Sequence, residues 1–168
     1  MKKKPIPSKK GTYIAIVAGA ITIVLVVAFN YYLDQAKISG ERFGNNLQQI
    51  QGDLKKQVSD YESKIRMWQQ GDLTKQEILQ ISENHLKELE NILSRYDALL
   101  PPLAYAPSLK LFKLSTQSQL ESDKLLKEWI ETGDNSTKIR SDEILQQSFE
   151  YETSALASYN MAKKGGTP

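Results

Sequence analysis

Residues 12–33 form one uninterrupted apolar run, and this run constrains what the chain can fold into. It reads TYIAIVAGAITIVLVVAFNYYL, and no charged side chain occurs between Lys10 and Asp34. About 20 consecutive apolar residues are enough to cross the hydrocarbon core of a bilayer as an α-helix. We therefore predict a transmembrane helix over 12–33, preceded by a basic tail, residues 1–11, and followed by a polar domain.

The residues at the two ends of the run fit the two interfaces of a membrane. Aromatic rings lie at its edges, as in an interfacial belt: Tyr13, Phe29, Tyr31 and Tyr32. Five lysines precede the run without an acid among them, whereas the charges that follow it nearly cancel. The positive-inside rule then predicts a cytoplasmic N-terminus and an extracytoplasmic domain, the topology of a single-pass signal anchor in the cell membrane.

Small residues recur at every fourth position near the start of the run, at Gly11, Ala15 and Gly19. Such a stripe lets two helix backbones approach closely in lipid. These three residues are therefore candidate contacts with a partner membrane helix or with a second copy of the chain.

Three other interpretations of the run compete with a membrane anchor. A cleaved signal peptide also begins basic and apolar, with Val26-Val27-Ala28 as a site to cut, although this run is longer than a usual signal region. A pilin-like precursor is suggested by Lys9-Lys10-Gly11, but the glutamate expected early in a pilin's apolar stretch is absent. The length and the lack of charge argue against a buried helix of a soluble protein.

The composition argues against several classes of function. There is no cysteine, so neither a disulfide framework nor a thiolate site can form. The formal net charge is +2, but five of the 22 basic residues belong to the tail, and the other 17 against 20 acids leave about −3. A mildly acidic domain argues against nucleic acid as a partner. The tail lysines fit anionic lipid headgroups.

Helical periodicity runs through residues 34–162, and residues 163–168 resemble a frayed tail. The sequence predicts an all-α, antiparallel up-down four-helix bundle. Its helices are expected from the membrane to about residue 69, and over about 74–100, 108–131 and 137–162. The first seam steps by three and four like a coiled coil, through Phe43, Leu47, Ile50, Leu54, Val58, Tyr61, Ile65 and Trp68.

The other three helices have their own expected core residues. The second buries Ile78, Ile81, His85, Leu89, Ile92, Tyr96 and Leu99, with Leu79, Leu86, Leu93 and Leu100 beside them. The third buries Leu111, Leu114, Leu125 and Trp129, with Ser118 and Ser122 between them. The fourth is expected to turn Leu145, Phe149, Leu156 and Tyr159 inward.

Glycine, threonine and proline mark the breaks. Gly71 is expected to end the first helix, and Thr74 with Glu77 forms a capping box for the second. Similar residues around Gly133 indicate either a duplicated hairpin or the usual helix signals. Glycines over 40–44 weaken the first helix, so that stretch is either a hinge or continuous helix.

The connector over 101–107 contains three prolines and is unusually apolar. It either closes the bottom of the core or touches lipid or a partner. Short connections make neighbouring helices antiparallel. We therefore expect Trp68 and Trp129 at the distal end of the bundle, and the connector and Lys163-Lys164 near the bilayer.

No motif for catalysis, cofactor binding or metal binding is found in the sequence. A di-metal bundle site needs Glu-x-x-His pairs, but there is one histidine, and Glu83 lies two residues before His85 on another helix face. No nucleophile elbow or phosphate-binding glycine loop occurs. We interpret His85 as a core or boundary residue, with a pH-sensitive contact or a single ligand as alternatives.

One modification motif is present. Asn135-Ser136-Thr137 fits the N-glycosylation pattern and lies in an expected exposed turn on the outer side. Asn135 is therefore a candidate glycosylation site.

These patterns favour a non-enzymatic, membrane-anchored accessory or scaffold subunit, or a protein-interaction module, with the bilayer and another protein or itself as partners. The alternative is an extracytoplasmic ligand-sensing bundle that signals through a partner, an analogy at the level of the fold. A pilin-like or secreted helical protein, and an enzyme with an unrecognised site, are minor alternatives.

Overall fold

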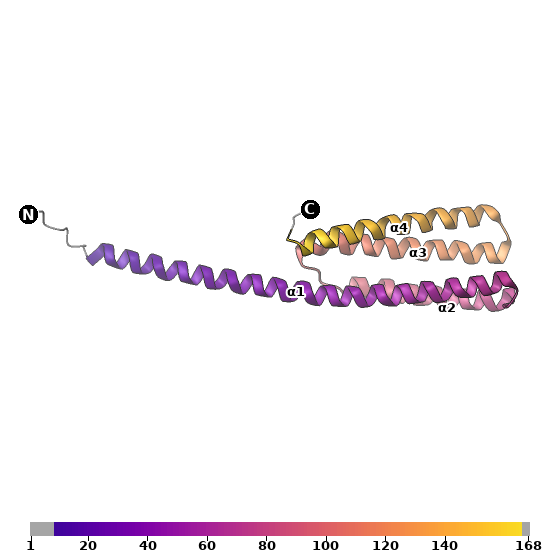
Figure 1. Cartoon of the computed structure of the whole chain (residues 1–168), viewed down its shortest axis with the longest axis horizontal. Coiled ribbons are helices and arrows are strands. Elements are labelled where there is room, and N and C mark those ends of the chain that lie inside the picture. The colour runs from indigo at the N-terminus through magenta and orange to yellow at the C-terminus, as the bar shows by residue number, and fades with distance from the viewer. Residues whose placement is uncertain (1–8, 166–168) are drawn as a thin grey trace, which may run out of the picture. The chain divides into compact units, whose positions relative to one another are not determined.

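The computed structural model describes residues 9–165, with side chains from residue 38 onward. This part is all-helical and contains no strand (Figure 1). Its elements are α1 (Lys9–Gln70), α2 (Lys75–Asp97), the 3-10 turn η1 (Leu103–Tyr105), α3 (Ala106–Thr132) and α4 (Asn135–Lys163). Two units are distinguished, Met1–Ser39 and Gly40–Pro168, and the second contains the bundle.

The predicted transmembrane helix lies outside the residues whose side chains are described. The backbone of α1 is helical from Lys9 onward. The small-residue stripe and the aromatic belt stay predictions; they comprise Gly11, Ala15, Gly19, Tyr13, Phe29, Tyr31 and Tyr32. Among the residues whose side chains are described, no helix combines the length and the apolar character needed to cross a membrane.

The expected helix ends are confirmed at the first hairpin. Gly71 has a φ of +86°, the left-handed conformation that glycine adopts most easily. The capping box is also present, because the Glu77 amide donates to Thr74 Oγ1 at 3.2 Å and the Thr74 amide donates to Glu77 Oε2 at 2.8 Å. The second helix ends at Asp97, earlier than expected. In a continuous helix the ring of Pro101 would clash with the carbonyl group of Asp97, four residues before it.

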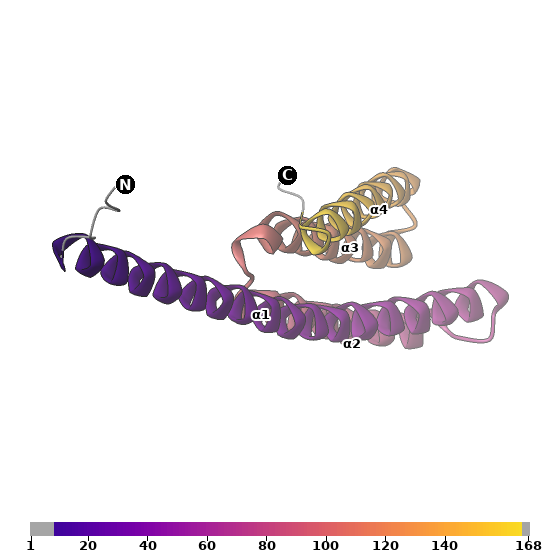
Figure 2. The ribbon, with the colours of Figure 1, turned by 60° about the vertical axis from the view of Figure 1, so that its left-hand side comes forward.

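The seam between α1 and α2 is confirmed as the main apolar core. Buried side chains on both helices pack together, including Phe43, Leu47 and Ile50 on α1 and Leu89, Ile92 and Tyr96 on α2. Figures 1 and 2 show the two helices side by side in both views. Polar contacts also join α1 and α2. Gln51 Nε2 donates to Tyr96 Oη at 2.6 Å, and Arg95 forms an ion pair with Asp53 at 2.7 Å.

Gly40 and Gly44 lie within the continuous helix α1, and Gly44 is closely packed against α4. The backbone is helical through both positions, so the described chain has no break there. A Cβ added at Gly44 would lie 2.5 Å from Tyr159 Oη, and one added at Gly40 would lie 3.4 Å from Tyr105 Cε2. Gly44 therefore leaves room for the Tyr159 side chain of α4, whereas a Cβ at Gly40 would only reach ordinary van der Waals contact with Tyr105.

The contact between α3 and α4 is built from small side chains that repeat every seven residues. We call it the serine–alanine seam; it comprises buried Ser108, Ser115 and Ser122 on α3 and Ser141, Ser148, Ala155 and Ala162 on α4. Ser122 Oγ donates to the carbonyl of Ser141 at 2.8 Å, and Ser141 Oγ donates back to the carbonyl of Ser122 at 2.9 Å. Ser148 Oγ donates likewise to the carbonyl of Ser115 at 2.9 Å. The hydroxyls of Ser122, Ser141 and Ser148 are thus satisfied across the interface while the two backbones stay close, whereas Ser108 donates to the carbonyl of Tyr105 at its own end of α3.

The sequence predicted the wrong face of the fourth helix to point into the core. Phe149 and Leu156 were expected inside but are 53% and 48% exposed. Leu145 and Tyr159 are partly buried. The reason is the serine–alanine seam: Phe149 follows Ser148, and consecutive side chains point about 100° apart around a helix.

The two ends of the bundle are arranged as helix parity predicts. Trp68 and Trp129 meet edge to face with ring centroids 5.5 Å apart, at the end where both hairpins turn. Figure 1 shows the α2–α3 connector and the end of α4 together at the other end. In the connector Leu99 and Tyr105 pack on the core, whereas Leu100 and Leu103 are 89% and 92% exposed. The expectation that Leu100 lies beside the second helix's core stripe is therefore wrong, as is closure of the core by Leu103.

The serine–alanine seam can be tested by enlarging one of its residues. We expect Ser148→Leu to lower the free energy of unfolding by about 1–3 kcal/mol, because the added carbons have no space between the backbones. Ser154→Leu is the matched control, since Ser154 is exposed on the same helix, and should change stability by less than about 0.5 kcal/mol. Chemical denaturation followed by circular dichroism measures both free energies of unfolding. If Ser148→Leu changes stability as little as Ser154→Leu does, the seam has space for a larger side chain.

Candidate functional site

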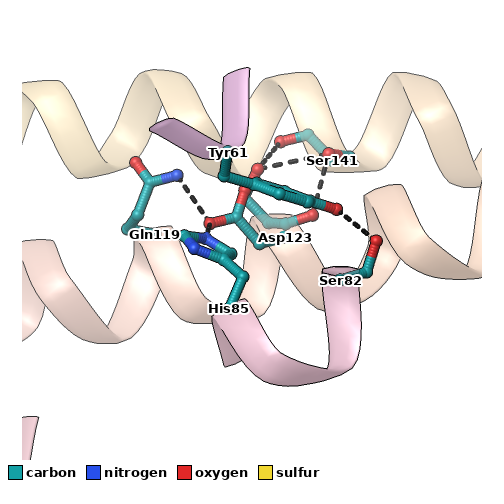
Figure 3. A network of polar contacts seen from close by, with 7 residues as sticks. Tyr61, Ser82, His85, Gln119, Asp123 and Ser141 are labelled. Atoms are coloured by element: carbon teal, nitrogen blue, oxygen red, sulfur yellow. Dashed lines mark hydrogen bonds and ion pairs between the residues drawn. The ribbon is translucent and has the colours of Figure 1, made fainter. Parts of the chain in front are cut away.

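A cluster of polar side chains lies inside the bundle and joins three helices (Figure 3). It consists of Tyr61 on α1, Ser82 and His85 on α2, and Gln119 and Asp123 on α3, all buried. Buried polar groups are stable only when hydrogen-bonded, so their geometry decides what the cluster can do.

Asp123 is the acceptor at its centre. Its Oδ2 accepts from Gln119 Nε2 at 2.9 Å and lies 3.0 Å from His85 Nε2. A carboxylate only accepts, so the proton of this second bond is assigned to Nε2 of the imidazole. Among the described residues, His85 Nδ1 is the one buried side-chain nitrogen or oxygen without a hydrogen-bond partner.

The ring of Tyr61 covers the imidazole. The two rings are stacked with centroids 4.0 Å apart and an interplanar angle of 14°. Tyr61 Oη lies 2.8 Å from Ser82 Oγ, and Ser82 donates its own proton to the carbonyl of Ile78, so the tyrosine is the donor. Burial is the main reason that the pKa of Tyr61 rises to about 12; the charge of Asp123 adds to it and the bond to Ser82 opposes it.

A second tyrosine repeats this arrangement within the same bundle. Tyr96 Oη lies 2.9 Å from Thr116 Oγ1, and Thr116 donates to the carbonyl of Phe112. Burial again raises the tyrosine pKa to about 12, partly offset by the hydrogen bond to Thr116. In both places a tyrosine donates to a hydroxyl on a neighbouring helix, which in turn donates to the carbonyl four residues earlier.

A shallow groove runs beside the cluster between α1 and α2. It has a volume of about 220 Å³, and its lining residues are Gln57, Asp60, Tyr61, Lys64, Ile81, Asn84, His85 and Glu88. Sites for drug-sized ligands usually measure about 300–1,000 Å³, so this groove fits only a small molecule.

The chemistry available to this cluster is limited. An aspartate that orients an imidazole resembles the acid–base half of a catalytic triad. Here, however, the free nitrogen of His85 is buried, and no hydroxyl lies against it in the described structure. No group of three His, Asp or Glu side chains in the described residues could hold a metal ion. The geometry fits a structural polar layer that aligns three helices.

Sequence reasoning found part of this cluster. The burial of His85 on the apolar stripe of the second helix is confirmed. The partners Gln119 and Asp123 were missed, because neither belongs to the expected apolar stripe of the third helix. Their four-residue spacing, which puts both on one helix face, was the available signal. Asn135 is exposed but lies in the first turn of α4 rather than in a loop, and its modification stays a prediction.

Comparisons with known proteins give this chain no family. No protein-family model, no curated protein and no solved structure matches it. The functional argument therefore rests on the residues and their geometry.

The two shielded tyrosines should make stability depend on alkaline pH. A pKa raised from 10 to about 12 means that the folded state resists ionisation, so this stability is complete below pH 10 and is lost between about pH 10 and 12. We expect a loss of roughly 2–3 kcal/mol for each ring over that interval. Absorbance titration should show two of the eight tyrosines ionising only as the chain unfolds. Ionisation of all eight near pH 10 in a folded chain would contradict the burial of both hydroxyls.

The role of Asp123 can be separated from that of a surface acid. Asp123→Ala leaves two buried donors, on His85 and Gln119, without an acceptor, and should lower the free energy of unfolding by about 3 kcal/mol. Asp123→Asn keeps one acceptor oxygen and should cost less. Asp60→Ala, at an exposed position in the groove, is the control and should stay within about 0.5 kcal/mol. Urea denaturation measures all three, and an Asp123→Ala value near the control would rule out a stabilising polar layer.

Proposed function

We propose that this protein is a non-enzymatic, membrane-anchored interaction module. Residues 12–33 anchor it as a single transmembrane helix with the N-terminus in the cytoplasm, and the helical bundle lies outside the cell membrane. The outer face of α4 binds a partner protein, so the chain acts as an accessory or scaffold subunit at the membrane surface.

The observation that carries this proposal is the apolar surface left on α4. Phe149 and Leu156 are one heptad apart and about half exposed, and partly buried Leu145 lies beside them. We call these three residues the outer stripe of α4. Single exposed apolar residues are common on any protein, but a stripe at heptad spacing is the pattern that a second helix recognises.

The charges along the same helix indicate the partner's chemistry. Glu143, Glu150 and Glu152 form no ion pair within the described residues. No Lys or Arg occurs between Arg140 and Lys163. A complementary partner is therefore an amphipathic helix of another protein that carries Lys and Arg beside its apolar residues.

The support for the anchor comes from the sequence. The apolar run over 12–33, the five lysines before it and the aromatic residues at its edges all fit one orientation across a bilayer. An anchor would hold the outer stripe near the membrane surface, where it meets other membrane proteins.

Ligand sensing is a second candidate, favoured by the groove beside His85. A small molecule in that groove could reach Tyr61 and, after a small displacement, the free Nδ1 of His85. Its small volume ranks this function below protein binding. A molecule that copurifies with the isolated chain and protects the groove would favour sensing.

Site-specific photo-crosslinking in washed membranes tests the proposed function. We expect a photoreactive phenylalanine analogue at Phe149 to crosslink to a basic amphipathic helix of another protein, less so at high salt. Leu156→Ser should lower that yield about fivefold, since about 1 kcal/mol of apolar burial is lost. The matched position is Ser154, exposed on α4 but about 140° away from Phe149 around the helix.

The outcomes separate the two halves of the proposal. Equal crosslinking at both positions, or crosslinks only to a second copy of the chain, would rule out the outer stripe as the binding surface. Release of the whole chain from membranes by alkaline washing would rule out the anchor.

A further inference from the structure

The connector between α2 and α3 carries the most exposed apolar side chains in the described chain. Leu100 and Leu103 are 89% and 92% exposed, and the connector has no charged residue between Asp97 and Lys110. Pro101, Pro102 and the turn η1 restrict the conformation of this segment, and Pro107 lies in the first turn of α3. Because these two leucines are already exposed, they can insert into an apolar environment without any rearrangement of the core.

The connector lies where the chain leaves the bundle toward the apolar run. Tyr105, the last residue of η1, packs against Gly40, the first residue of the bundle. The chain from Gly40 back to Leu33 is about 10 Å long as helix and at most about 25 Å long when fully extended. If 12–33 crosses a bilayer, Gly40, against which Tyr105 of the connector packs, is therefore tethered within that distance of the lipid, whatever the conformation of the linking residues.

Three exposed lysines lie at the same end of the bundle. Lys163 is the last residue of α4 and Lys164 follows it; α4 contacts η1 through Tyr159 and Tyr105, with ring centroids 5.2 Å apart. Lys110 lies in the second turn of α3, and none of these three lysines pairs with an acid in the described structure. No Asp or Glu follows Glu152 in the sequence. Exposed lysines next to exposed leucines are the combination that binds the interface of an anionic bilayer.

We propose that this end of the bundle is a lipid-contact surface: Leu100 and Leu103 insert at the level of the headgroups, and Lys110, Lys163 and Lys164 bind anionic phospholipid. The inference rests on the membrane anchor of the proposed function. It adds a second attachment, which fixes the orientation of the bundle on the membrane and directs the connector toward the lipid.

Fluorescence quenching by brominated acyl chains tests this contact. The full chain, reconstituted in vesicles, is compared with a Leu103→Trp variant and with an Ile139→Trp variant, whose site is also exposed but lies by the second hairpin turn. The native Trp68 and Trp129 lie at that same distal end and supply the background. We expect Leu103→Trp to lose much of its added fluorescence to brominated lipid, more in vesicles with anionic lipid than in zwitterionic ones, and Ile139→Trp to lose little.

Alkaline extraction of the same vesicles separates failure of the contact from failure of the anchor. If the chain resists extraction but Leu103→Trp is quenched no more than Ile139→Trp, the lipid-contact surface is wrong and the anchor stands. If the chain is extracted, the anchor is wrong. Equal quenching with anionic and zwitterionic lipid would overturn the role of the three lysines.

Discussion

The close approach of α3 and α4 is the constraint on which the rest of the bundle depends. Reciprocal hydrogen bonds from Ser122 and Ser141, with Ser148 one heptad further along, fix both the spacing and the register of that hairpin. Because the small residues of α4 face α3, Phe149 and Leu156 lie on a different face of the helix, which is exposed. The apolar surface that we assign to a partner is thus a direct consequence of the serine–alanine seam.

How well the buried face of each helix could be predicted depends on the size of the side chains that make up that face. In α1 and α2, large aliphatic residues at intervals of three and four make the core, so Phe43, Leu89 and Ile92 were correctly expected inside. In α4 the core face is made of Ser and Ala, whose side chains have little apolar area, and the larger Phe149 suggested the wrong face. Periodicity finds the face with the greatest apolar area, and here that face lies outside the closest contact.

The polar cluster shows a second limit of reasoning along one chain. His85 was recognisable as a buried residue, but its partner Asp123 comes from another helix, and only the three-dimensional arrangement pairs them. A hydrogen bond between distant segments leaves no local pattern in either one. The exposure of the connector's leucines was likewise not predictable. An apolar connector has the same composition whether its side chains close the core or point outward, and only the path of the backbone decides between the two.

The fit between α1 and α4 also has a consequence for how this sequence can vary. Tyr159 Oη occupies the space that a side chain at position 44 would need. A larger residue at 44 requires either that the Tyr159 side chain moves away or that position 159 becomes shorter, so the two positions are expected to change together in related chains. Two sites more than one hundred residues apart along the sequence are thereby coupled through the volume of a single hydroxyl group.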